Sequence, residues 1–215
     1  MTDSLKKRLY TSIFLLILVF SMFTIELFFI YSLIVFSVLA IIEFLTITKI
    51  FIKNKINLYL INTFFWIYII FFCLLFLIYY SYSPLKLIIL SLLLCCVASD
   101  IGGFLFGKKF KGPKLTKISP NKTISGAVGS VLSSFLILWF LFKYLSINLN
   151  LNIFFIAFIT SVSCQAGDLF FSYLKRKAKI KDTGQFLPGH GGVLDRLDGI
   201  LFGVPVGIFF INFLN

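Results

Sequence analysis

The stretch KDTGQFLPGHGGVLDRLDG, residues 181–199, gathers the only histidine of the chain, three of its eight acidic residues and a run of glycines. Asp195 and Asp198 are three residues apart, so a helix starting here would present both carboxylates on one face. A third carboxylate, Asp168, lies in the preceding apolar segment. Carboxylate oxygens are the ligands that a hard cation such as Mg²⁺ prefers, and a lone histidine disfavours zinc. These three aspartates therefore predict a magnesium site.

Two segments are suited to binding phosphate. Gly191 and Gly192 end a PGHGG turn whose backbone amides can approach phosphate oxygens closely. Upstream, SPNKT places Ser119, Lys122 and Thr123 at the predicted start of a helix, where free amides favour an anion. The residue order of a Walker A loop is missing. Acids that suit a metal, together with bases that suit phosphate, indicate phosphate chemistry.

Asp100 and Asp168 occupy similar positions in two different apolar segments. Asp100 comes eight residues before Lys108, and Asp168 comes seven residues before Lys175. At a rise of about 1.5 Å per residue, each lies roughly 10–12 Å along its helix from that lysine. Ionisable groups inside a membrane are costly and usually mark functional sites. We therefore expect both aspartates to share a polar cavity near the cytoplasmic face.

The rest of the chain is apolar enough to need a membrane. It is 60% hydrophobic, with 29 Phe among 215 residues and a mean hydropathy of +1.03, and only 13% of its residues are charged. So few charges could not cover a soluble core of this size. Continuous rather than alternating apolar runs favour helices over a barrel. We expect one all-α domain over residues 1–215, a bundle of about seven transmembrane helices within a range of six to nine.

Each predicted span is an apolar run close to the roughly 20 residues that cross a bilayer. The runs are 9–24, 27–48, 58–80, 85–107, 124–145, 152–173 and 199–214. Of the 20 Lys and Arg residues, 18 lie in four segments that form every second connection, and the positive-inside rule assigns these to the cytoplasm. Anionic headgroups explain much of the net charge of +12, so no nucleic-acid partner is expected.

Several other residues have ordinary structural interpretations. Glu26 and Glu43 are isolated acids near span ends, and we expect an interfacial or interhelical hydrogen bond for each. The four cysteines lie in apolar runs without CxxC spacing and are expected to act as small hydrophobic residues. The basic N-terminus and first span predict an uncleaved anchor, and the topology favours a bacterial cytoplasmic membrane.

Several segments together resemble the signature of the phosphatidate cytidylyltransferase (CDP-diacylglycerol synthase) family. Residues 172–199 carry the family order S-x-x-K-R, K-D, P-G-H-G-G and D-R-x-D. The segment from Asp100 to FGKKF, the SPNKT stretch and GDLFFS also match. The resemblance covers most of residues 6–214, although the first three spans share only hydrophobic character. One position departs: relatives often have an acid shortly after SPNKT, where this chain has Ser125, so no carboxylate role is assigned there.

The resemblance implies a Mg²⁺-dependent reaction of CTP with phosphatidic acid that gives CDP-diacylglycerol and pyrophosphate. It implies that Asp168, Asp195 and Asp198 hold Mg²⁺ and a second cation. The residues expected in the catalytic machinery are Lys175, Arg176, His190, Arg196 and Asp198, with His190 positioning phosphate rather than transferring a proton. The residues expected to bind substrate are Ser119, Lys122, Thr123, Asp100, Lys181, Asp182, Gly191 and Gly192.

Other functions and assemblies stay open on the residues alone. A CTP-dependent lipid-alcohol kinase would share basic loops and spans, but the order of the signature argues against it. An ion or phosphate transporter should show two related halves with binding near the midplane, whereas these acids lie near one face. Membrane lipids are expected around the protein, and the sequence leaves open whether it forms a homodimer.

Overall fold

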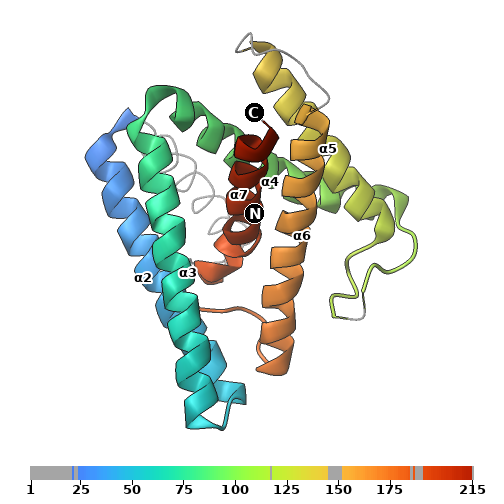
Figure 1. The fold of residues 1–215 in the computed structure, drawn as a ribbon. Helices are drawn as coiled ribbons and strands as arrows, with labels where there is room; N and C mark the ends of the chain where they lie inside the picture. Colours follow the sequence, from blue (N-terminus) through green and yellow to red (C-terminus); the bar gives the residue numbers. More distant parts are fainter. Residues whose placement is uncertain are drawn as a thin grey trace, which may run out of the picture. The chain divides into compact units, whose positions relative to one another are not determined.

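The computed structural model describes residue 21, residues 24–144 except 117, residues 152–184, residue 186 and residues 191–214, without the side chains of residues 84 and 214. These ranges contain helices and no strand, which confirms the all-α prediction. The helices are α2 (Glu26–Phe51), α3 (Lys55–Ser81), α4 (Ser83–Phe110), α5 (Ile124–Tyr144), α6 (Asn152–Lys177) and α7 (Leu194–Leu214) (Figure 1). The predicted first span lies almost entirely outside the described residues, and His190 lies outside them.

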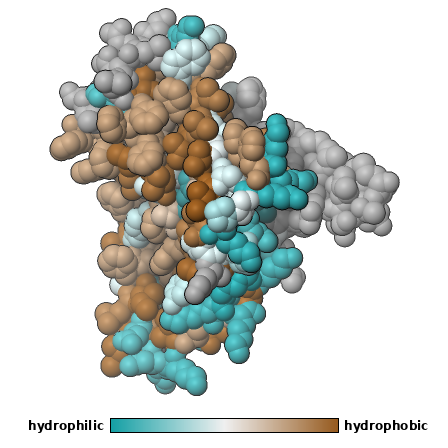
Figure 2. All heavy atoms as spheres, turned by 90° about the vertical axis from the view of Figure 1, so that its right-hand side faces the viewer, coloured by the Kyte–Doolittle hydropathy of each residue, from teal (hydrophilic) through white to brown (hydrophobic). Residues whose placement is uncertain are grey.

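Five of the described helices, α2 to α6, are long and apolar enough to cross a membrane. They correspond to the five runs predicted between residues 27 and 173. Only Tyr82 separates α3 from α4, and Pro84 lies in the first turn of α4, where a missing amide hydrogen costs no helical hydrogen bond. Hydrophobic residues cover much of the face seen in Figure 2, as expected of side chains that meet lipid.

The chain divides into two compact units, and the first contains α2, most of α3 and Leu174–Leu197. α2 and α3 form an antiparallel hairpin (Figure 1). Phe44 stacks on Phe65 with 3.8 Å between ring centroids. The buried Thr48 hydroxyl donates a hydrogen bond to Oδ1 of Asn62 at 2.9 Å. Aromatic stacking and a buried polar pair therefore fix these two helices against each other.

The second unit contains α4, α5, most of α6 and α7 from Asp198 onward. α4 and α5 pack closely through glycine: a Cβ at Gly102 would overlap Ser133, and a Cβ at Gly129 would overlap Phe106. The hydroxyls of Ser99 on α4 and Ser161 on α6 are 2.8 Å apart and buried. Small residues and hydroxyl pairs are the usual means of joining helices inside a bilayer, where lipid removes the hydrophobic drive between them.

Glycines at intervals of four residues also line α7. A Cβ at Gly199 or Gly203 would press against Cys164 on α6, and one at Gly207 would press against Leu92 on α4. Cys164 is buried with a free thiol, as are Cys95 and Cys96, and Cys73 is a half-buried free thiol, so the cysteines pack as small residues as predicted. The glycine contacts hold α7 from Gly199 onward against α6 and α4.

Candidate active site

The connection between α4 and α5 places a lysine and a hydroxyl at the start of α5. Thr123 precedes the first residue of α5, and its hydroxyl accepts a hydrogen bond from the Gly126 amide at 3.1 Å. This is the position predicted for it at a helix start. The Lys122 amide donates to the Ser119 carbonyl at 3.0 Å, so the three predicted phosphate-binding residues share one tight turn.

Lys122 forms an ion pair with Asp168 on α6, and the two side chains are 25% and 30% exposed. The Ser172 hydroxyl, one turn later on α6, donates to Oδ1 of Asp168 at 3.3 Å. The structure thus joins a predicted phosphate-binding lysine to a predicted metal-binding carboxylate. Because both are partly exposed, an anion can compete for the lysine and a cation for the carboxylate.

Two further aspartates approach the same part of α6. Sγ of Cys164, one turn before Asp168, lies 3.8 Å from Oδ1 of Asp100 on α4. Gly167 packs so closely on the backbone carbonyl of Asp198 that a Cβ there would overlap it. Asp198 is buried, and its Oδ1 accepts a hydrogen bond from the following amide at 2.7 Å. The second unit therefore brings three of the predicted acidic residues to neighbouring turns.

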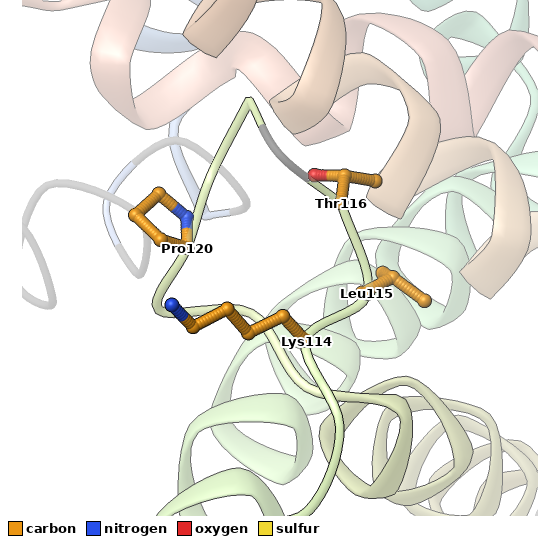
Figure 3. A pocket seen from close by; sticks show the side chains of 4 residues that line it. All are labelled: Lys114, Leu115, Thr116 and Pro120. Carbon is orange, nitrogen blue, oxygen red and sulfur yellow. The ribbon is translucent and has the colours of Figure 1, made fainter.

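A pocket of about 370 Å³ lies in the connection between α4 and α5. Its lining residues are Lys114, Leu115, Thr116 and Pro120, which Figure 3 shows around the bend of the connection. The ammonium and hydroxyl groups are hydrogen-bond donors, and the leucine and proline are apolar. The pocket is therefore suited to an anionic group with an apolar part, close in sequence to Lys122.

In the first unit, Asp195 is tied to the loop that precedes it. Its Oδ1 pairs with Lys175 Nζ at 2.7 Å, and its Oδ2 accepts hydrogen bonds from the amides of Thr183 at 2.8 Å and Gly192 at 3.0 Å. Burial disfavours the charged form and would raise the pKa of Asp195. The hydrogen bonds from Lys175 and the two amides outweigh burial and lower this pKa below its usual value. Both oxygens of an ionised Asp195 thus have donors.

Glu43 is a second carboxylate bound to this loop, although it lies on α2. It is 2% exposed, and it accepts hydrogen bonds from the Thr183 hydroxyl at 2.7 Å and from the amides of Val193 at 3.0 Å and Leu194 at 2.8 Å. The expected structural hydrogen bond is confirmed, but its partners are in the predicted active-site loop. No periodicity or motif in the sequence links residues so far apart, which is why sequence reasoning missed this role.

The other predicted residues of the loop divide into packed glycines and exposed charges. Gly191 has a φ of +83°, and a Cβ at Gly192 would overlap Thr183. The Gly192 amide, expected to meet phosphate, donates to Asp195 instead. Four predicted residues in or beside the loop are exposed: Arg176 near the end of α6, Lys181 and Asp182 in the loop, and Arg196 at the start of α7. The three basic side chains among them lie at the surface, where an anionic substrate can reach them.

The predicted metal ligands are divided between the units. Asp168 and Asp198 belong to the second unit, and Asp195 belongs to the first. Within the described ranges, no three side chains from His, Cys, Asp and Glu form a ready metal site. Asp168 and Asp198 fit a hard cation by their oxygen chemistry and by their approach along α6. The oxygens of Asp195 already have donors, so the site of three aspartates stays a prediction.

Comparison with known proteins identifies the family. The sequence profile of the cytidylyltransferase family matches residues 4–214, nearly the whole chain. The chain belongs to this family. A phosphatidate cytidylyltransferase of Helicobacter pylori is 49% identical over 116 residues, or 54% of this chain and 43% of the relative. One from Rickettsia felis is 45% identical over 136 residues, or 58% and 59%. The chain thus spans about half the length of these relatives.

Ser125, the departure from the family pattern, has a structural role. Its hydroxyl donates a hydrogen bond to the Lys111 carbonyl at the end of α4 and lies 3.0 Å from Oγ1 of Thr123. Lys111 adopts a φ of 51°, which turns the chain away from α4. An ionised carboxylate cannot donate to a carbonyl. A hydroxyl at position 125 therefore suits the sharp turn that begins this connection.

Proposed function

We propose that this protein transfers CMP from CTP to phosphatidic acid, giving CDP-diacylglycerol and pyrophosphate. The observation that carries the proposal is the family match over residues 4–214, which includes the whole signature segment. The relatives from Helicobacter pylori and Rickettsia felis are named phosphatidate cytidylyltransferases. The ion pair of Lys122 with Asp168 and the exposed arginines supply the charges that such a reaction needs.

The chemistry is an in-line substitution at phosphorus. An oxygen of the lipid phosphate monoester attacks the α-phosphorus of CTP, the bond from that phosphorus to the bridging oxygen breaks, and pyrophosphate leaves with the electron pair. The nucleophile is already largely ionised near neutral pH, because the second phosphate pKa is about 6. The protein therefore acts chiefly by holding anionic groups in line and neutralising their charge.

The two units supply different parts of this task. In the first, Lys175, Arg176 and Arg196 neutralise phosphate oxygens, and the loop bound to Asp195 sets their arrangement. In the second, Lys122 releases Asp168 and turns to an incoming phosphate. In this second unit, Asp168 and Asp198 would hold Mg²⁺. When bound, the metal would stabilise negative charge on the phosphates and on the leaving group.

The proposed setting is a bacterial cytoplasmic membrane with the basic connections inside. The full bundle has seven spans in this proposal, five of them corresponding to α2–α6. Lys122, Lys175 and Arg196 all belong to segments assigned to the cytoplasm, which is where CTP is found. A cavity open toward the bilayer would let lipid tails remain in the membrane while the phosphate meets the nucleotide.

The test is a label-transfer assay on purified protein in detergent micelles with phosphatidic acid. CTP labelled at the α-phosphate is compared with CTP labelled at the γ-phosphate, each with Mg²⁺ and with chelator. We expect α label, and no γ label, in a lipid product that forms only with Mg²⁺. Transfer of γ label to an added lipid alcohol would identify a kinase instead. Absence of label from lipid in both cases would contradict the proposal.

A further inference from the structure

The buried carboxylate of Glu43 joins α2, an apolar helix, to the predicted active-site loop. It accepts hydrogen bonds from the hydroxyl of Thr183 and from the amides of Val193 and Leu194, which lie 140 to 151 residues further along the chain. All of these groups lie in the first unit. Within the described part of the chain Glu43 has no ion pair with a lysine or arginine, so its charge is balanced by hydrogen-bond donors.

The amides of Val193 and Leu194 belong to the start of α7. The first amides of a helix have no partner within the helix, and the helix dipole is positive there. A carboxylate at this place satisfies two of these donors and complements the dipole. Because the contact is buried, solvent screens it little. Glu43 thus fixes where α7 begins, and the two residues that follow are Asp195 and Arg196.

Thr183 links Glu43 to Asp195. Its Oγ1 lies 2.7 Å from Oε2 of Glu43 and 3.0 Å from Oδ2 of Asp195, while its amide donates to Asp195. One hydroxyl hydrogen serves one acceptor at a time. The shorter contact is to Glu43, and the amide of Thr183 holds Asp195. A Cβ at Gly184 or Gly192 would overlap Glu43, so the backbone on both sides packs directly against this carboxylate.

We propose that Glu43 is a positioning residue of the transferase: through Thr183 and the start of α7 it sets the place of Asp195, and so of Lys175. This rests on the proposed function. Glu43 touches no reacting group in this scheme. Through its hydrogen bonds Glu43 holds Thr183 and the start of α7, and with them Asp195 and its partner Lys175. Misplacing such groups by about 1 Å lowers a rate by on the order of 10²-fold.

The test compares Glu43→Gln with Glu26→Gln, the matched change at the exposed glutamate of the same helix. Glutamine keeps one acceptor oxygen but turns an amide group toward donors. We expect kcat per folded molecule to fall by roughly 10- to 100-fold in Glu43→Gln. We also expect faster tryptic cleavage after the exposed Lys179 and Lys181 in micelles, because the connection is released. Glu26→Gln should match the wild type in both measurements.

The outcomes separate the two proposals. If Glu43 only stabilises the fold, Glu43→Gln lowers the thermal midpoint but leaves kcat per folded molecule and the tryptic rates unchanged, which overturns the inference. If the wild type makes no CDP-lipid, the proposed function fails, and the tryptic comparison still decides whether Glu43 anchors the connection. If Glu43→Gln does not fold, Thr183→Val is decisive: unchanged kcat and cleavage would refute the link through Thr183.

Discussion

At the scale of single residues, Asp195 shows how a carboxylate can be kept charged although it is largely buried. Burial alone would raise its pKa, yet Lys175 and two amides lower it. With a folded-state pKa below the ordinary value of about 3.9, the ionised group stabilises the fold above that value. This stability is lost only as the pH falls through the lower, folded-state pKa.

Removing the lysine should therefore raise the pH at which acid begins to destabilise the protein. In Lys175→Met, burial still disfavours the charge while its main partner is gone, so Asp195 should take up a proton at a higher pH than in the wild type. The measurement is the thermal midpoint in detergent from about pH 3 to about pH 7. We expect the midpoint of the variant to start falling at a higher pH. Parallel curves would show that Lys175 does not set this pKa.

Asp198→Asn tests the predicted metal-binding role. Asparagine has nearly the same shape and keeps an oxygen that can accept the hydrogen bond from the next amide, so the fold should survive. Loss of one negative oxygen should lower activity by orders of magnitude, because a hard cation prefers carboxylates. Lys143→Ala is the control, since Lys143 is exposed over the ring of Trp139 at the far end of α5. Full activity of Asp198→Asn would remove this residue from the site.

The residues differ in how far the sequence could predict them. Thr123 was predictable because a helix cap follows from residue type and the adjacent pattern. Asp195 and Asp198 were predictable as neighbours on one helix face, because residues three positions apart lie on the same side of a helix. The hydrogen bonds of Asp195 to Lys175 and Thr183 depend on how the loop folds back, which no local pattern contains. Glu43 depends on the tertiary fold entirely.

At the scale of helices, glycine decides how closely α4 and α5 pack. A Cβ at Gly129 would overlap Cβ and the ring of Phe106, atoms that cannot move without shifting α4. Gly129→Ala should therefore destabilise the protein by about 1–3 kcal/mol despite the better helix propensity of alanine. The check is the thermal midpoint in detergent. Val128→Ala, at an exposed neighbouring position, should change it little; equal effects would contradict the close packing.

The helix boundaries followed from the sequence where polar or special residues punctuate the apolar runs. Pro84 and the following apolar residues mark the start of α4, and the lysines at its end mark its exit from the membrane. The start of α7 at Leu194 was harder to predict from hydropathy. Asp195 and Asp198 are polar although they lie in the helix, so the apolar run begins only at residue 199. Their place is explained by contacts to other elements, not by an apolar pattern.

At the scale of the whole molecule, charge asymmetry and helix number predict opposite faces for successive connections. Two single cysteine substitutions test this topology. Lys53→Cys places a thiol in a predicted cytoplasmic connection, and Tyr82→Cys places one in a predicted external connection; both positions are exposed. In intact cells, a membrane-impermeant maleimide should label only the Tyr82→Cys protein. Permeabilised cells should allow labelling of the Lys53→Cys protein as well. Labelling of both in intact cells would overturn the topology.

The apolar composition predicted a helical membrane protein, because so few charged residues leave no other way to cover the chain. Composition could not predict that α3, α6 and α7 would each contribute to both compact units. That division depends on which side chains meet, such as Phe44 with Phe65 in the first unit and Ser99 with Ser161 in the second.

The long separation between Glu43 and the start of α7 also orders events during biosynthesis. Val193 and Leu194 are made 150 and 151 residues after Glu43. A ribosome adding about 5–20 residues per second needs roughly 8–30 s for that interval. During this time α2 is present without the amides that will bind its carboxylate. A nascent chain that stops before Val193 lacks both amides, so the hydrogen bonds that hold the start of α7 to α2 form only after residue 194 has been made.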